Sequence, residues 1–135
     1  MPYIDVSSSR CPGYVVVALR GELDICQATL LARTLSAAAT SGSPVIVDLG
    51  GLTFTDCSAL GALVSARKRA LQAGGDLLLA APAQLVLHLL SLTGLIDWLP
   101  VFASVDQAAN GDGRPLAPGW VAREQAGGET AAGET

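Results

Sequence analysis

Short runs of aliphatic and β-branched residues alternate along the chain with longer segments in which apolar residues recur at helical spacing. Continuous apolar runs are typical of buried strands, whereas the spaced pattern favours amphipathic helices. The predicted strands are 4–6, 14–19, 44–49, 76–80 and a short segment at 101–102. The predicted helices are 25–39, 56–73, 82–92 and a last short helix ending at Asn110. This alternation predicts an α/β fold with a largely parallel sheet and crossover helices.

Turn signals separate the first elements. The segment Arg20–Asp24 is predicted to end the second strand, and the Asp24 side chain to cap the helix that follows. The Gly50–Gly51 pair is predicted to turn the chain after the next strand. The segment Leu52–Phe54 would then return toward the core.

The later elements carry cap signals of their own. The Asp56 side chain is predicted to cap the second helix, and Gly74–Gly75 to stop it. Pro82 is predicted to begin the third helix. Either Ser104 or Asp106 would cap the last one.

The second helix has two distinct faces. Its predicted core stripe contains one cation, Arg67, whose stem would follow the edge of the core while its head reaches water. The stripe is Leu60, Leu63, Val64, Arg67 and Leu71. The opposite face is small and weakly polar: Ser58, Ala62, Ser65 and Arg69. Such a face allows the backbone of another protein to approach closely.

Composition limits the architecture and the partners. The chain has 135 residues, half of them hydrophobic and 4% aromatic, so one domain with an aliphatic core is expected. Residues 1–110 are predicted to form this domain, and residues 111–135 are a Gly/Ala/Glu/Thr-rich segment predicted to be flexible. Within that segment, Trp120 is expected to dock on the domain or to mark a peptide-like contact. The formal net charge of −4 is spread without a basic stripe, which argues against a nucleic-acid partner.

Leu77–Ile96 carries no formal charge and is long enough to span a membrane. Pro82, Gly94 and several polar residues interrupt it, so a strand and a helix are predicted instead. The N-terminus has no signal-peptide pattern, and three unpaired cysteines argue against a secreted disulfide framework. We therefore expect a reduced, cytoplasmic protein.

The sequence offers no set of catalytic residues. His88, the only histidine, lies among leucines and is predicted to pack at the core or its boundary, without a partner for acid–base or metal chemistry. Asp48 ends a buried strand, as does the phosphorylated aspartate of a receiver domain. The acidic pair and late lysine of a receiver are missing, so Asp48 is predicted to cap the glycine turn. We expect no enzyme activity, no metal and no cofactor.

The start of the second helix, Asp56-Cys57-Ser58, carries the most chemistry. With Asp56 as the cap, the Ser58 hydroxyl is free for modification. Helix N–H groups would favour a phosphoryl group there, and Asp56 would repel it. Cys57 is predicted to be a small buried stand-in for serine. An exposed Cys57 would instead be a candidate redox site.

In their order, several segments resemble the STAS domain of the bacterial anti-sigma-factor antagonists over about residues 3–110. They are Gly21–Asp24, Val45–Leu49, Leu52–Gly61, Ala73–Leu77 and Leu89–Phe102. The family's phosphorylation motif, Asp-Ser-Ser-Gly, corresponds to Asp56-Cys57-Ser58-Ala59, with Cys57 and Ala59 as departures. The resemblance implies a STAS fold, with a small mixed sheet of four to five strands and about four helices packed mainly on one face.

The resemblance also implies partner switching. The unphosphorylated antagonist would bind an anti-sigma factor that has a histidine-kinase-like ATPase domain, and so free a sigma factor. The kinase would phosphorylate Ser58 and release the antagonist, and a PP2C-type phosphatase would restore it. The expected docking surface is Asp24, Asp56, Cys57, Ser58, Ala62, Ser65 and Arg69. Two alternatives stay open: a STAS subunit of another regulatory or transport assembly, and a redox-sensing domain using Cys57.

Overall fold

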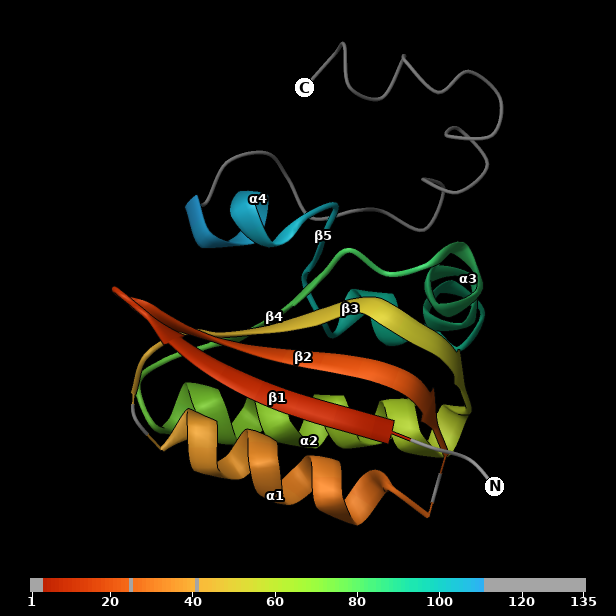
Figure 1. Cartoon of the computed structure of the whole chain (residues 1–135), viewed down its shortest axis with the longest axis horizontal. Coiled ribbons are helices and arrows are strands. Elements are labelled where there is room, and N and C mark those ends of the chain that lie inside the picture. The colour runs from red at the N-terminus through yellow and green to blue at the C-terminus, as the bar shows by residue number, and fades with distance from the viewer. Residues whose placement is uncertain (1–3, 25, 41, 111–135) are drawn as a thin grey trace, which may run out of the picture.

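The computed structural model describes residues 4–24, 26–40 and 42–110, with the backbone alone for Ser58. In this part of the chain, five strands form one sheet in the order β1-β2-β3-β4-β5 (Figure 1). Only the pairing of β1 with β2 is antiparallel; the other pairs are parallel. The strands are β1 Ile4–Cys11, β2 Tyr14–Leu23, β3 Val45–Thr55, β4 Leu77–Ala80 and β5 Val101–Phe102.

Helices connect the parallel strands, as the alternating pattern predicts. They are α1 Ala28–Ala39, α2 Cys57–Gln72, α3 Gln84–Leu92 and α4 Val105–Asn110, with a 3-10 turn, η1, at Leu95–Asp97. The predicted mixed sheet with about four helices is confirmed. Leu77–Ile96 divides into β4, α3 and the start of η1, and no helix in the described ranges is both long and apolar enough to cross a membrane.

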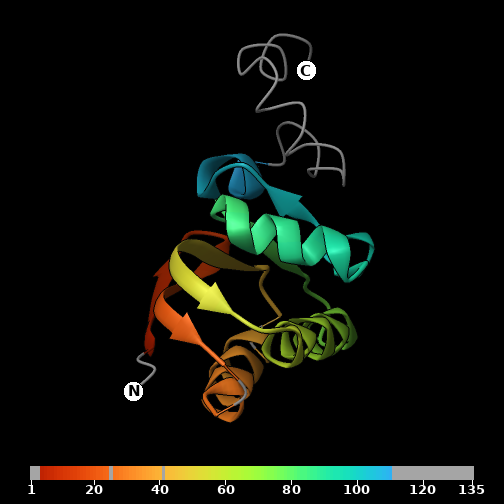
Figure 2. The ribbon, with the colours of Figure 1, turned by 90° about the vertical axis from the view of Figure 1, so that its right-hand side faces the viewer.

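Two hydrophobic clusters lie on the two faces of the sheet. Helices α1 and α2 cover one face, and α4 lies on the other (Figure 2). Buried side chains of α3 join the α1–α2 cluster. The smaller cluster under α4 consists of Ile46, Ala80, Phe102 and Ala108, with Tyr14, Val16 and Leu78 packed against it. Because β2 and β3 are buried on both faces here, continuous apolar runs are required.

Strands β2 and β3 are longer than predicted, because two irregularities let their pairing continue. Arg20–Asp24 does not end β2, and Gly50–Gly51 does not turn the chain. The register passes from Ala18↔Asp48 to Arg20↔Gly51, a shift typical of a β-bulge. A Cβ atom on Gly51 would lie only 2.9 Å from Cγ of Arg20, so this approach requires glycine. The Asp48 carboxylate accepts the Gly50 N–H at 2.9 Å, as expected, but inside a strand.

Strand β1 is also longer than the predicted 4–6 segment. It forms a hairpin with β2 through Pro12 and Gly13, with Cys11 opposite Tyr14. Gly13 has φ +89°, a value that favours glycine. A hydrogen bond with Cys11 raises the pKa of the Tyr14 hydroxyl above its ordinary value.

Helix α1 begins at Ala28 rather than at residue 25, so the predicted Asp24 helix cap is wrong. The residue before the helix is Gln27, whose side chain makes no cap bond. The Asp24 carboxylate instead accepts the Cys26 N–H at 2.9 Å, and the Gln27 side chain accepts the Asp24 N–H at 3.0 Å. Asp24 therefore orders the turn that leads into the helix.

The core stripe of α2 is only partly as predicted. Leu60 and Leu63 are fully buried, but Leu71 is 49% exposed. The buried positions also include three alanines, because α2 packs closely: Ala59, Ala66 and Ala70. The Arg67 head does not simply reach water. It pairs with the Asp76 carboxylate at 2.9 Å and donates to the Trp98 carbonyl at 3.1 Å.

Helix α3 corrects two further predictions. His88 is exposed, so its predicted packing at the core or its boundary is wrong; Val86, Leu87 and Leu90 fill the core instead. The helix begins at Gln84, after Pro82. In α4, the Ser104 hydroxyl accepts the Gln107 N–H at 3.1 Å, so Ser104 supplies the predicted cap.

Ala81 lies between β4 and α3 with φ +57°, in the left-handed region that disfavours a Cβ atom. We predict that Ala81→Gly stabilises the protein by about 0.5–1 kcal/mol, after the larger entropy of unfolded glycine is subtracted. Urea unfolding measures this change. The matched control is Ala83→Gly, because Ala83 has φ −63° and gains no such relief. If Ala81→Gly is no more stable than the wild type, the backbone of Ala81 is not strained.

Candidate functional site

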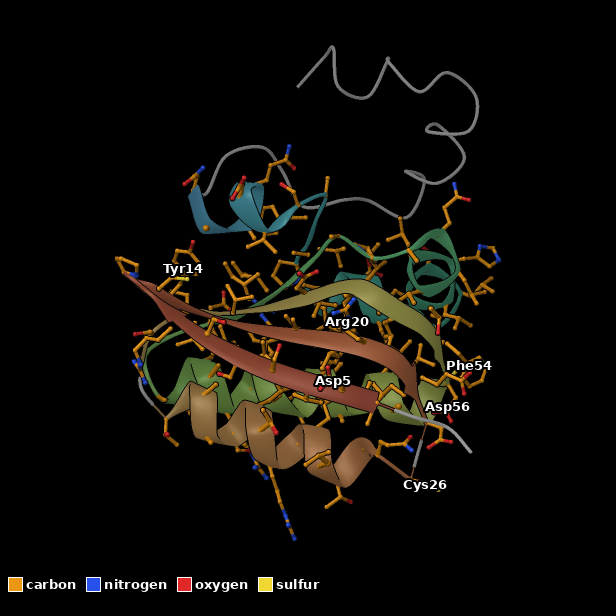
Figure 3. The ribbon with its side chains drawn as sticks, in the orientation of Figure 1. Asp5, Tyr14, Arg20, Cys26, Phe54 and Asp56 are labelled. Atoms are coloured by element: carbon orange, nitrogen blue, oxygen red, sulfur yellow. The ribbon has the colours of Figure 1, made fainter. Side chains whose placement is uncertain are left out.

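The carboxyl ends of β2 and β3 meet at one edge of the sheet. Their last paired residues are Leu23 and Thr55, and Asp24 and Asp56 follow them directly. Loops after parallel strands share an edge, and the two predicted acidic site residues are accordingly brought together. Figure 3 shows Asp56 at this end of the molecule, with Phe54 beside it and Cys26 on the α1 side.

Asp56 begins α2 as its N-cap. Its backbone is extended, with φ −125° and ψ 172°, and its carboxylate accepts the Ala59 N–H at 2.8 Å. The predicted cap is therefore confirmed. Cys57 and Ser58 form the first turn of α2, where backbone N–H groups and the helix dipole give a positive potential. Thr55, the residue directly before Asp56, is buried in the core at 2% exposed.

Cys57 is exposed, so its prediction as a buried stand-in for serine is wrong. As the first residue of α2, it lies before the turn in which Ala59 and Leu60 point into the core. Cys26 is also exposed, and Cys11 is half-buried. The three cysteines are free thiols. A redox role for Cys57 stays a prediction, now with an accessible thiol.

The rest of the predicted docking face follows α2 away from Asp56. Ala62 is half-buried and Ser65 is exposed. The Arg69 guanidinium donates to the Ser36 hydroxyl of α1 at 2.6 Å, which draws its head toward that helix. Of the predicted docking residues on α2, Arg69 therefore contacts α1.

Sequence reasoning missed Phe54, which is 47% exposed although its segment was predicted to return to the core. Leu52 does return, at 1% exposed. The register then shifts from Gly21↔Leu52 to Glu22↔Phe54, leaving Thr53 as an extra residue. One extra residue reverses the alternation of side chains, so Phe54 points outward. The single sequence holds no signal for this bulge, because it depends on the pairing with β2.

In the described ranges, no group of three or more His, Cys, Asp or Glu side chains could hold a metal ion. The site therefore consists of a helix start, two strand-end carboxylates, an exposed thiol and an exposed aromatic side chain. These features fit recognition by another protein, with the helix start as a place where an anion would change the surface.

The sequence resembles those of known proteins. The sequence model of the STAS domain matches residues 5–108. The anti-sigma-F factor antagonist RsfA of Mycobacterium tuberculosis is 30% identical over 97 residues, 70% of this chain and 76% of that protein. The anti-sigma-B factor antagonist of Bacillus subtilis is 27% identical over 100 residues, covering 74% and 92% of the two chains.

Solved structures share the fold. The antagonist SpoIIAA in its unphosphorylated form superposes with a TM-score of 0.67 and 23% identity, covering 79% of this chain and 95% of that one. The phosphorylated form of Bacillus SpoIIAA gives a TM-score of 0.60 and 22% identity, covering 79% and 98%.

The Asp56 cap generates a stability prediction. Asp56→Ala removes the carboxylate that accepts the Ala59 N–H and should cost about 1 kcal/mol of unfolding free energy, whereas Asp56→Ser should retain most of it. The control is Asp24→Ala, which breaks a bond in a turn but uncaps no helix, and should cost less. Urea unfolding measures all three variants. Equal losses for Asp56→Ala and Asp24→Ala would show that the helix cap contributes no more unfolding free energy than a hydrogen bond in a turn.

Proposed function

Because this chain belongs to the STAS domain family and, within it, to the anti-sigma-factor antagonists, we propose that it binds a kinase-type anti-sigma factor and so releases a sigma factor. The partner would carry a histidine-kinase-like ATPase domain. Phosphorylation of Ser58 by that kinase would end the complex, and a PP2C-type phosphatase would restore the antagonist. The chain itself would act as a ligand and a substrate, without catalysis and without a cofactor.

The observation that carries this proposal is the position of Ser58. It is the second residue of α2, directly after a helix start capped by Asp56 and beside the ends of β2 and β3. The kinase would approach this edge of the sheet, where the backbone places Ser58. The adjoining residues Asp24, Asp56, Cys57, Ala62, Ser65 and Arg69 would form the docking surface.

A phosphoryl group on Ser58 would meet opposing effects. The positive end of the α2 dipole would stabilise an anion by about 0.3–1 kcal/mol, while the Asp56 carboxylate would repel it. In the free protein these effects partly cancel, and water screens both. In a complex, the added charge of about −1.5 to −2 would be desolvated against the partner. This cost would exceed the dipole term, so phosphorylation would weaken docking more than it perturbs the fold.

The proposed partners act on transcription, so the chain would work in the cytoplasm. An exposed Cys57 favours a redox-sensing role as the second candidate. Modification of its thiol would add bulk next to Ser58 and impede docking without a kinase. A STAS subunit of another assembly would keep the same fold and exchange only the partner.

The proposed switch predicts two properties of Ser58. Incubation with the cognate kinase and ATP should label the wild type and leave Ser58→Ala unlabelled. By calorimetry, Ser58→Ala should bind that kinase as the wild type does. Ser58→Asp should lose on the order of 1–3 kcal/mol of binding free energy, because it buries an unpaired charge near Asp56.

The labelling and the calorimetry can each contradict a different part of the proposal. Label that persists on Ser58→Ala would move the acceptor to another residue. Equal affinities of Ser58→Asp and Ser58→Ala would reject charge as the release mechanism, even if Ser58 is the acceptor. Circular dichroism of the variants checks that the fold is retained.

A further inference from the structure

An aromatic side chain stands exposed at the proposed docking edge. Phe54 is 47% exposed, whereas Phe102, on the same sheet, is 8% exposed. The difference follows from what covers each position. The α4 cluster covers Phe102 together with Ile46, and the second bulge turns Phe54 outward near the end of β3. Water therefore contacts about half of a large apolar side chain that the fold could have buried.

The backbone around Phe54 is held rigidly before any partner arrives. Phe54 lies opposite Glu22 in the β2–β3 ladder, and the Thr53 hydroxyl donates to the Gly21 carbonyl at 3.0 Å. On its other side, Thr55 is buried and Asp56 is bound to the start of α2. A residue fixed in this way loses little backbone entropy on binding. Phenylalanine is one of the aromatic residues enriched in the cores of protein interfaces.

We propose that Phe54 is the apolar anchor of the docking surface and inserts into an apolar pocket of the anti-sigma factor. This inference rests on the proposed function. Phe54 precedes Asp56 by two residues and Ser58 by four, so a partner that holds the phenyl ring also faces the start of α2. Figure 3 shows Phe54 and Asp56 together at this end.

The surroundings specify the chemistry of that pocket. The exposed Glu22 lies across the ladder from Phe54, and the half-buried Asp56 follows Phe54 by two residues in the chain. Carboxylates at the rim of an interface require hydrogen-bond donors on the other side. The pocket is therefore apolar at its base and bordered by donors. A second copy of this chain does not offer such a site at the same edge. Two copies meeting there would place carboxylates against carboxylates, which repel each other.

Calorimetry of the full chain tests the anchor. The probe is a purified histidine-kinase-like anti-sigma factor from the same organism, titrated first with the wild type. Phe54→Ala should raise Kd by roughly 30-fold or more, as for other interface hot spots. Phe54→Gln, which keeps a long side chain but replaces the apolar ring with a polar amide, should lose as much and serves if Phe54→Ala does not fold. The matched control is Leu71→Ala: Leu71 is equally exposed, at 49%, but lies in the last turn of α2. It should change Kd by less than about twofold.

The contrary results are distinct. A wild type that binds while Phe54→Ala and Phe54→Gln bind equally well overturns the anchor and leaves the proposed function intact. An equal loss of affinity for Leu71→Ala overturns the anchor too. The affinity would then depend on exposed apolar area in general and not on the position of Phe54. A wild type that binds no such anti-sigma factor refutes the proposed function and the anchor with it. Light scattering that shows a wild-type dimer, lost in Phe54→Ala, would assign Phe54 to a contact between copies.

Discussion

The parallel pairing of β2 with β3 determines where nearly every functional feature lies. Its register contains two irregularities, one at Gly50–Gly51 and one at Thr53, and it ends at Leu23↔Thr55. Because the pairing runs to this point, Asp24 and Asp56 come to the same edge. Because Thr53 is the extra residue, Thr55 faces the core and Phe54 faces water. A different register would turn Phe54 toward the core and separate Asp24 from Asp56.

At the start of α2, the Asp56 cap and the proposed phosphorylation site, Ser58, share one turn. The Asp56 carboxylate already satisfies the Ala59 N–H at 2.8 Å, so the helix does not need Ser58 for its own stability. The proposed modification of Ser58 would leave this cap bond in place. The buried residues of the next turn, Ala59 and Leu60, fix this end of α2 against the sheet.

Much of this architecture could be predicted from the sequence, because burial on both faces leaves a continuous apolar run. The Val45–Leu49 run predicted a buried strand, which is confirmed. Asp56 is a different signal, a cap residue before a helical pattern, and its cap is confirmed too. Features that depend on pairing or on close packing could not be predicted. The outward turn of Phe54 depends on the bulge at Thr53, and the exposure of Leu71 depends on how the last turn of α2 packs. The segment after residue 110, including Trp120, lies outside the described residues, so its predicted flexibility stays a prediction.

The central claim is that this domain acts by exchanging protein partners, and release of a sigma factor tests it most directly. The measurement begins with a purified complex of the anti-sigma factor and its sigma factor, and follows free sigma factor by size exclusion as the antagonist is added. Unphosphorylated protein should displace the sigma factor in proportion to its concentration, and protein phosphorylated on Ser58 should not. Equal displacement by the two forms, or none by either, would contradict the account.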